Sequence, residues 1–246
     1  MHTFLIQTNR GTVEHDFAFN LVESVKYQNW YSNSQKYNIL FTDSPEIDTF
    51  NSRDFTPVGS LEFVFMLLRK FFGKPAPAPL NIPIQLQTED FLKRQCGYCD
   101  ETTVPLPSFI KSATQYKKFT DMIEKPSDIK RVPKDNYFYS TPTYIDSEWR
   151  CHVYKGKLVG LNNYQGDFLW FPNVSLIKEM IAAYTDAPIA YTLDVGINGD
   201  GTFVIEVHPF VSCGLYGFND HKILPQMFIA GFKSLLGVGY DVKNLL

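Results

Sequence analysis

The stretch from Tyr191 to Pro209 carries two carboxylates at a spacing that could hold a divalent cation. Polar and apolar residues alternate along both halves, as in two strands that each bury one face. The polar residues are Thr192, Asp194, Glu206 and His208. The sequence Asn-Gly-Asp-Gly at 198–201 supplies a turn, which predicts a β-hairpin. If the turn centres on Asp200, Asp194 lies opposite Glu206.

Two facing carboxylates need a compensating charge. Directly opposed residues on adjacent strands have Cβ atoms roughly 5 Å apart. Two ionised carboxylates at that distance repel each other unless a proton or a cation lies between them. Mg²⁺ is the usual solution, because it takes oxygen ligands and can be shared with phosphate. The alternative is a hairpin whose polar face is merely solvated.

The composition describes a globular chain without a general attraction to polyanions. The 246 residues are 44% hydrophobic and 15% aromatic, which can fill the core of one large domain or two smaller ones. The net charge of −3 gives no bulk attraction to nucleic acid or to an anionic membrane, although a local basic groove is compatible with it. No apolar run approaches the ~20 residues that span a bilayer. The N-terminus lacks the pattern of a signal peptide, so we expect a cytoplasmic protein.

The four cysteines are Cys96, Cys99, Cys151 and Cys213. Only Cys96 and Cys99 are close in sequence, and no second pair of cysteines or histidines at ligand spacing completes a zinc site. Reduced, structural thiols are the default for a cytoplasmic chain, and a redox or metal role for the Cys96–Cys99 pair is the alternative.

Residues 1–73 form the first predicted unit, a small α/β domain. Two short strands (4–7 and 37–41) precede a turn at 56–60 and a helix from Leu61 to Phe72, whose apolar residues recur at helical spacing. We interpret Ser60 and Glu62 as helix-capping residues. Residues 74–83 are rich in proline, which cannot continue a helix, and are predicted to be a linker.

Residues 84–246 form the second predicted unit. Its expected helices are 89–95 and 174–184, and its expected strands are 108–111, 137–140, 144–154 and 158–161. The strand that ends at Lys111 leads into a small, polar loop containing Lys117 and Lys118, which could close over phosphates or could be a solvated cluster. Alternation in the strand 144–154 places Glu148 and Arg150 on the same face. His152 lies on this face too and is interpreted as structural.

An ordered set of short motifs resembles the ATP-grasp superfamily. The motifs are Phe109-Ile110-Lys111, Lys118-Phe119, Ser147-Glu148-Trp149-Arg150, Asp194-Val195-Gly196, Ile205-Glu206-Val207-His208 and Gly214-Leu215-Tyr216. Within the superfamily they are most similar to the clade named for two arginines and one lysine, found largely in bacteria and their phages. The resemblance implies an α+β, ATP-grasp-like fold of antiparallel sheets with helices, preceded by the small N-terminal α/β unit. It also implies the cytoplasm of the host as the location if a phage encodes the chain.

The resemblance assigns roles to individual residues. Lys111 and Lys118 are expected near the ATP phosphates, the backbone of Tyr139, Ser140 and Thr141 near adenine, and Glu148 near the ribose. Arg150 resembles the catalytic arginine that contacts phosphate or the developing acyl phosphate.

The metal ligands and the second arginine also follow from the resemblance. Asp194 and Glu206 resemble the two Mg²⁺ ligands. His208 stands where the family usually has asparagine, and imidazole is a softer ligand, which implies weaker Mg²⁺ binding or tolerance of Mn²⁺. The second arginine has Arg94 as its candidate, and an exposed helix charge is the competing explanation for that residue.

The resulting functional hypothesis is an ATP-dependent ligase that joins a carboxylate to an amine through an acyl phosphate. Its substrates would be a peptide, a protein terminus or a metabolite. Phosphoryl transfer needs neutralised phosphate charge and little covalent help, which fits this set of cations and metal ligands. Two alternatives stay open: a nucleotide-binding module with little turnover, and an ATP-dependent enzyme that acts on nucleic acid ends.

Overall fold

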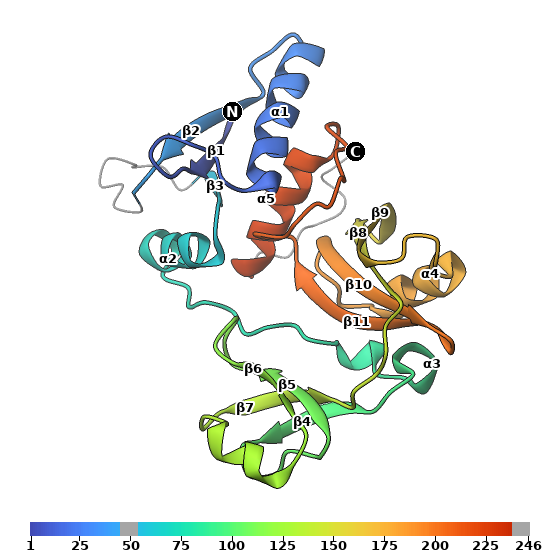
Figure 1. The fold of residues 1–246 in the computed structure, drawn as a ribbon. Coiled ribbons are helices and arrows are strands. Elements are labelled where there is room, and N and C mark those ends of the chain that lie inside the picture. The colour runs from blue at the N-terminus through green and yellow to red at the C-terminus, as the bar shows by residue number, and fades with distance from the viewer. Residues whose placement is uncertain (45–53, 238–246) are drawn as a thin grey trace.

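The computed structural model describes residues 1–44 and 54–237, which form three sheets with helices packed around them (Figure 1). An N-terminal parallel sheet lies beside helix α5 (Leu224–Leu235). A central antiparallel sheet follows, and a second antiparallel sheet lies apart from the first. The predicted α+β class, with antiparallel sheets and a small N-terminal α/β part, is confirmed.

The N-terminal sheet has the strand order β2-β1-β3 and is entirely parallel. Its elements are β1 (His2–Gln7), α1 (Asp16–Tyr31), β2 (Tyr37–Thr42), β3 (Phe55–Val58) and α2 (Leu61–Phe72). The predicted turn at 56–60 is wrong at its start, because β3 occupies these residues. Pro57 is tolerated there because β3 is an edge strand, so no second neighbour needs the missing amide. The Ser60 hydroxyl caps α2 by accepting a hydrogen bond from the Phe63 amide.

The central sheet has the order β11-β10-β8-β9 and buries one face under helix α4. Its elements are β8 (Ser147–Tyr154), β9 (Lys157–Gly166), α4 (Val174–Ala183), β10 (Ala190–Asn198) and β11 (Gly201–Pro209). Apolar side chains from the strands pack on Ile177, Met180 and Ile181 of α4. The opposite face carries the acids and Arg150.

The remaining sheet has the order β4-β7-β5-β6 and its own small core. Its strands are β4 (Cys96–Asp100), β5 (Ser108–Ser112), β6 (Thr120–Ile123) and β7 (Asn136–Ser140). Short helical turns flank them: η1 (Ile84–Leu86), α3 (Glu89–Leu92) and η2 (Pro126–Arg131). All pairings in this sheet are antiparallel.

One buried cluster joins the two sides of the predicted linker. Phe4 and Phe17 from the N-terminal part pack in the same cluster as Phe210, Leu224 and Met227. The predicted boundaries at 73 and 84 remain a prediction. Among the described residues, no helix combines the length and apolar character needed to cross a membrane.

Candidate functional site

Two cavities lie between the central sheet and the sheet β4-β7-β5-β6. The larger has a volume of about 500 Å³ and the smaller of about 350 Å³. Lys111, Thr120 and Glu206 line both cavities. The predicted phosphate-binding lysine and a predicted metal ligand therefore lie where the two cavities meet.

The hairpin β10–β11 places Asp194 directly opposite Glu206, as the alternation of residues predicts. The route to this register differs from the expected one. The turn is Gly199-Asp200, and a β-bulge then leaves Ile205 without a paired residue, since Val195 pairs with Val204. A bulge of this kind re-aims side chains. Ile205 consequently lines the larger cavity beside Glu206.

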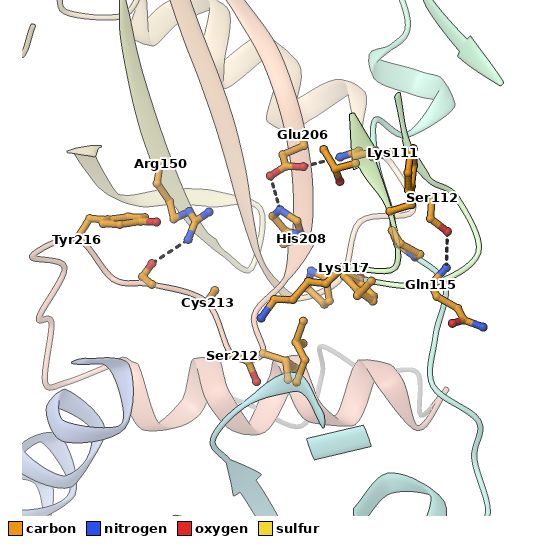
Figure 2. A pocket seen from close by; sticks show the side chains of 18 residues that line it. Lys111, Ser112, Gln115, Lys117, Arg150, Glu206, His208, Ser212, Cys213 and Tyr216 are labelled. Atoms are coloured by element: carbon orange, nitrogen blue, oxygen red, sulfur yellow. Dashed lines mark hydrogen bonds and ion pairs between the residues drawn. The ribbon is translucent and has the colours of Figure 1, made fainter. Parts of the chain in front are cut away.

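The two carboxylates are neutralised by the protein's own cations. Arg150 donates from Nε and Nη2 to the two carboxylate oxygens of Asp194, at 2.8 and 2.7 Å. Lys111 Nζ lies 2.5 Å from Glu206 Oε2. The expected repulsion between the two acids is thus replaced by two ion pairs, one from β8 and one from β5 (Figure 2).

Glu206 remains ionised because its partners outweigh its burial. Burial raises its pKa, but the hydrogen bond from His208 Nε2, at 2.6 Å, and the charges of His208 and Lys111 lower the pKa further. The net effect is a pKa well below the usual value. An ionised carboxylate at this point can accept a metal ion or a cationic side chain.

Arg150 is a fixed, buried cation. Its Nη1 donates to the Gly214 carbonyl at 3.1 Å, and its guanidinium group lies 4.9 Å from the ring centre of Tyr216 and 5.7 Å from that of Tyr164. Burial lowers the pKa of Arg150, but Asp194 raises it above its usual value. Local sequence patterns did not identify either tyrosine, because they meet Arg150 only through the fold.

The residues predicted to hold a metal do converge. Ligand atoms of Asp194, Glu206 and His208 all lie within 4.8 Å of one another. Two carboxylates and an imidazole form a donor set that suits a divalent cation, so these residues fit Mg²⁺ or Mn²⁺. A bound ion would compete with Lys111 and His208 for Glu206.

The larger cavity contains most of the predicted nucleotide residues. Ser140, Thr141 and Glu148 line it, together with the apolar side chains of Phe109, Met122 and Ile205. Glu148 Oε2 accepts a hydrogen bond from the Tyr164 hydroxyl at 2.6 Å. Tyr139 packs instead with the core of the sheet β4-β7-β5-β6.

The neighbouring lysines of the 113–119 loop have different surroundings. Lys118 Nζ pairs with Asp135 at 3.0 Å and does not line either cavity, whereas Lys117 lines the smaller one. Burial raises the pKa of Asp135, but hydrogen bonds from Ser112, Thr114 and Lys118 bring it down to about 2. The structure therefore does not bring Lys118 to the predicted phosphate site.

Arg94 is not an exposed helix charge. It follows α3 and donates from Nη1 to the Val204 carbonyl at 2.7 Å, with its guanidinium group 5.2 Å from the ring centre of Phe203. Burial lowers its pKa, and it lines the larger cavity. Its role as the second arginine stays a prediction.

The other polar candidates are structural in their surroundings. His152 is fully buried, stacks on Phe218 at 4.4 Å and places Nε2 3.2 Å from the Leu215 carbonyl. All four cysteines are free thiols. Burial raises the pKa of Cys96, and that of Cys99 to about 11, which disfavours the reactive thiolate.

Comparison with known families now identifies the chain. Residues 91–225 match a family described as an ATP-grasp domain, the second family of its clade. The chain belongs to this family. The predicted ATP-grasp superfamily and fold are confirmed. The assignment of two arginines and one lysine to particular residues stays a prediction.

Solved structures of ATP-grasp proteins share the fold over nearly the whole chain. D-alanine–D-alanine ligase from Bacillus anthracis, complexed with ATP, has a TM-score of 0.54 at 11% identity, covering 98% of this chain and 100% of that one. The RimK domain protein ATP-grasp from Sphaerobacter thermophilus has a TM-score of 0.52 at 13% identity, covering 97% and 100%. ATP-grasp ligase PsnB, complexed with a minimal precursor, has a TM-score of 0.54 at 11% identity, covering 96% and 99%. No curated protein matches the sequence significantly.

Proposed function

We propose that the protein is an ATP-dependent ligase that joins a carboxylate to an amine through an acyl phosphate. The observation that carries this proposal is the pair of ion pairs, Arg150–Asp194 and Lys111–Glu206, at the side of the central sheet that faces both cavities. They concentrate cations and potential metal ligands between a nucleotide-sized cavity and a second, smaller one. That arrangement suits phosphoryl transfer, in which positioning and charge neutralisation dominate.

The nucleotide would occupy the larger cavity. Its apolar walls suit adenine, and the backbone of Ser140 and Thr141 supplies polar groups beside it. Glu148, oriented by Tyr164, would accept hydrogen bonds from the ribose. Lys111 lies at the end of this cavity and would move from Glu206 to the phosphates as these bind.

The acid would react in the smaller cavity. Its carboxylate oxygen attacks the terminal phosphorus of ATP, the bond from that phosphorus to the bridging oxygen breaks, and ADP leaves. The amine then attacks the carbonyl carbon, the bond to the phosphate oxygen breaks, and phosphate leaves while the nitrogen loses a proton. Asp194, Glu206 and His208 would hold Mg²⁺ or Mn²⁺, which neutralises phosphate charge when bound.

Arg150 is placed to stabilise the charge that develops on the acyl phosphate. Asp194 and Gly214 engage three of its N–H groups, and a guanidinium group has five. The remaining two have no partner among residues 1–44 and 54–237. Donors held rigidly in this way need no reorganisation during reaction.

Thermal melting tests the nucleotide part of the proposal. ATP with Mg²⁺ should raise the melting temperature, since a ligand at 100 times its Kd stabilises the native state by about 2.7 kcal/mol. Lys111→Ala should reduce that shift, and Lys157→Ala, which changes an exposed lysine of the β8–β9 hairpin, should not. An unchanged melting temperature at saturating ATP and Mg²⁺ would refute the proposal.

A nucleotide-binding module with little turnover is the second candidate. The observation that favours it is that both predicted acidic metal ligands already have cationic partners. Release of ADP, measured with and without candidate acids and amines, separates the two functions. A ligase releases ADP only when both substrates are present or when the acid alone is phosphorylated.

A further inference from the structure

The smaller cavity has one positive charge more than its neutralised pairs require. Three cationic side chains line it, and two of them have carboxylate partners: Lys111 pairs with Glu206, and Arg150 with Asp194. Lys117 is the third. No carboxylate in the described part of the chain lies within ion-pair distance of its ammonium group. Glu62, whose pKa responds weakly to Lys117, lies exposed on α2.

The loop that carries Lys117 directs its side chain into the cavity. Asp135 anchors the loop from the other side, through Ser112, Thr114 and Lys118. Lys117 itself has a φ of 56°, in the left-handed region that side chains other than glycine rarely adopt. Figure 2 shows its side chain extended between His208 and Ser212. A solvated surface lysine would need neither this backbone conformation nor this direction.

Arg150 lines the same cavity as a second, immobile cation. Its position is fixed by Asp194, the Gly214 carbonyl and the Tyr216 ring. Lys117, in contrast, has a flexible chain and no partner to displace. The cavity therefore offers one fixed and one adjustable site for anionic groups.

The wall between these two cations is partly apolar. Leu61, Pro79, Pro209 and Val211 contribute to it, in a space of about 350 Å³. Such a volume lies at the low end of the range for small-molecule pockets. A short apolar chain with an anionic group at each end would match the walls and both cations.

We propose that the smaller cavity binds a small dicarboxylic acid. Resting on the ligase function proposed above, one carboxylate lies near Arg150 for phosphorylation, and Lys117 binds the other. Lys117 is then a specificity-determining residue rather than a phosphate ligand. An acid with a single carboxylate leaves the Lys117 ammonium without a partner in a partly enclosed site and binds more weakly.

Direct binding tests this assignment without requiring the amine. The protein is saturated with the non-hydrolysable ATP analogue AMP-PNP and Mg²⁺, and acids are titrated by calorimetry. The probes are succinate, glutarate and adipate, each compared with the monocarboxylate of the same chain length. We expect the best dicarboxylate to bind at least about tenfold more tightly than its partner, a difference of about 1.4 kcal/mol.

Lys117→Ala should abolish the preference for the dicarboxylate and leave the Kd of AMP-PNP within about twofold of the parent. Lys117→Arg should restore part of the preference, because it keeps the charge. Lys134→Ala removes the same charge from an exposed position that lines neither cavity and is the matched control.

Three results would overturn the inference: equal affinity for both acid classes, no binding of any of these acids to the nucleotide-loaded protein, or a loss of AMP-PNP affinity in Lys117→Ala. The last would make Lys117 a phosphate ligand. Failure of the parent protein to bind AMP-PNP at all would instead refute the ligase function itself.

Discussion

Asp194 and Arg150 occupy paired positions on neighbouring strands, since β10 and β8 place them directly opposite each other. Asp194 is 1% exposed and Arg150 is 7% exposed. A buried ion pair of this kind is costly to break from one side, because the remaining charge has lost both water and partner. The pair therefore links the chemistry of the site to the stability of the sheet.

Asp194→Asn should destabilise the metal-free protein by about 3 to 5 kcal/mol, because it leaves Arg150 buried without its carboxylate partner. Urea unfolding in the presence of a chelator measures this effect. Asp200→Asn, at the exposed turn of the same hairpin, is the control and should be nearly neutral. A higher urea midpoint for Asp194→Asn would mean that repulsion from Glu206 outweighs the pairing with Arg150.

His152 gives the stability a defined pH dependence. Burial lowers its pKa from 6.5 to about 3, and the charge of Arg150 lowers it further in the same direction. Above pH 6.5 the residue is neutral in both states and contributes no difference. Below that pH the unfolded chain takes up a proton that the folded protein refuses, so the free energy of unfolding decreases by up to about 1.4 kcal/mol per pH unit.

His152→Gln tests this sign, since glutamine can still donate to the Leu215 carbonyl but does not titrate. The free energy of unfolding should fall less steeply between about pH 6.5 and pH 5 in the variant than in the parent. Parallel curves for the two proteins would show that His152 already takes up its proton in the folded state.

At the level of elements, strongly periodic segments were predictable from the sequence. The helix from Leu61 to Phe72 has the predicted bounds, and the predicted helix 174–184 appears as α4. The hairpin was predictable too, because alternation places Asp194 and Glu206 on one face. The bulge at Ile205 was not, since nothing in an alternating pattern marks which residue loses its partner.

Other elements have no comparable local signal. α1 carries exposed Phe19, Trp30 and Tyr31 in addition to its buried residues, which obscures an amphipathic pattern. β4 has the sequence CGYCD, and its strand conformation depends on pairing with β7, some forty residues later. α5 was missed although its buried face is extensive.

Gly231 shows how closely α5 approaches the end of β11. A Cβ atom at this position would overlap the carbonyl oxygen of Phe210. Gly231→Ala should therefore lower the free energy of unfolding by about 1 to 3 kcal/mol, as overpacking does, although alanine favours helices. Gly199→Ala, where no atom lies within 4 Å of the added Cβ, is the matched control in the denaturation experiment. A more stable Gly231→Ala variant would show that helix propensity dominates here.

At the level of the whole molecule, the site depends on segments that only the complete fold brings together. Lys111 and Glu206 are 95 positions apart in the chain and come from different sheets. The residue types of the site were predictable from a resemblance, but their pairing was not. Local patterns specify which face of a strand a side chain occupies, and they carry no information about which sheet lies opposite.

The sheet β4-β7-β5-β6 is coupled to the central sheet through few polar contacts. Its core is small, with Val104, Ile110, Ile123, Val132 and Tyr137 as its buried members. Across the larger cavity, the Lys111–Glu206 ion pair and the hydrogen bond from Arg94 to the Val204 carbonyl connect the two sides. A nucleotide in that cavity would add contacts to both sheets at once.

Hydrogen exchange should therefore change unevenly when the nucleotide binds. Without ligand, amides of the 113–119 loop and of β5 and β6 should exchange faster than those of β10, because few buried contacts oppose their local opening. AMP-PNP with Mg²⁺ should slow exchange in that loop and in β11, whereas α1, which packs in the cluster of Phe4 and Met227, should change little. Exchange measured by mass spectrometry after proteolysis resolves these segments. Equal slowing in α1 and in the loop would indicate that the nucleotide stabilises the whole fold uniformly, and that the sheet β4-β7-β5-β6 does not open independently of the rest.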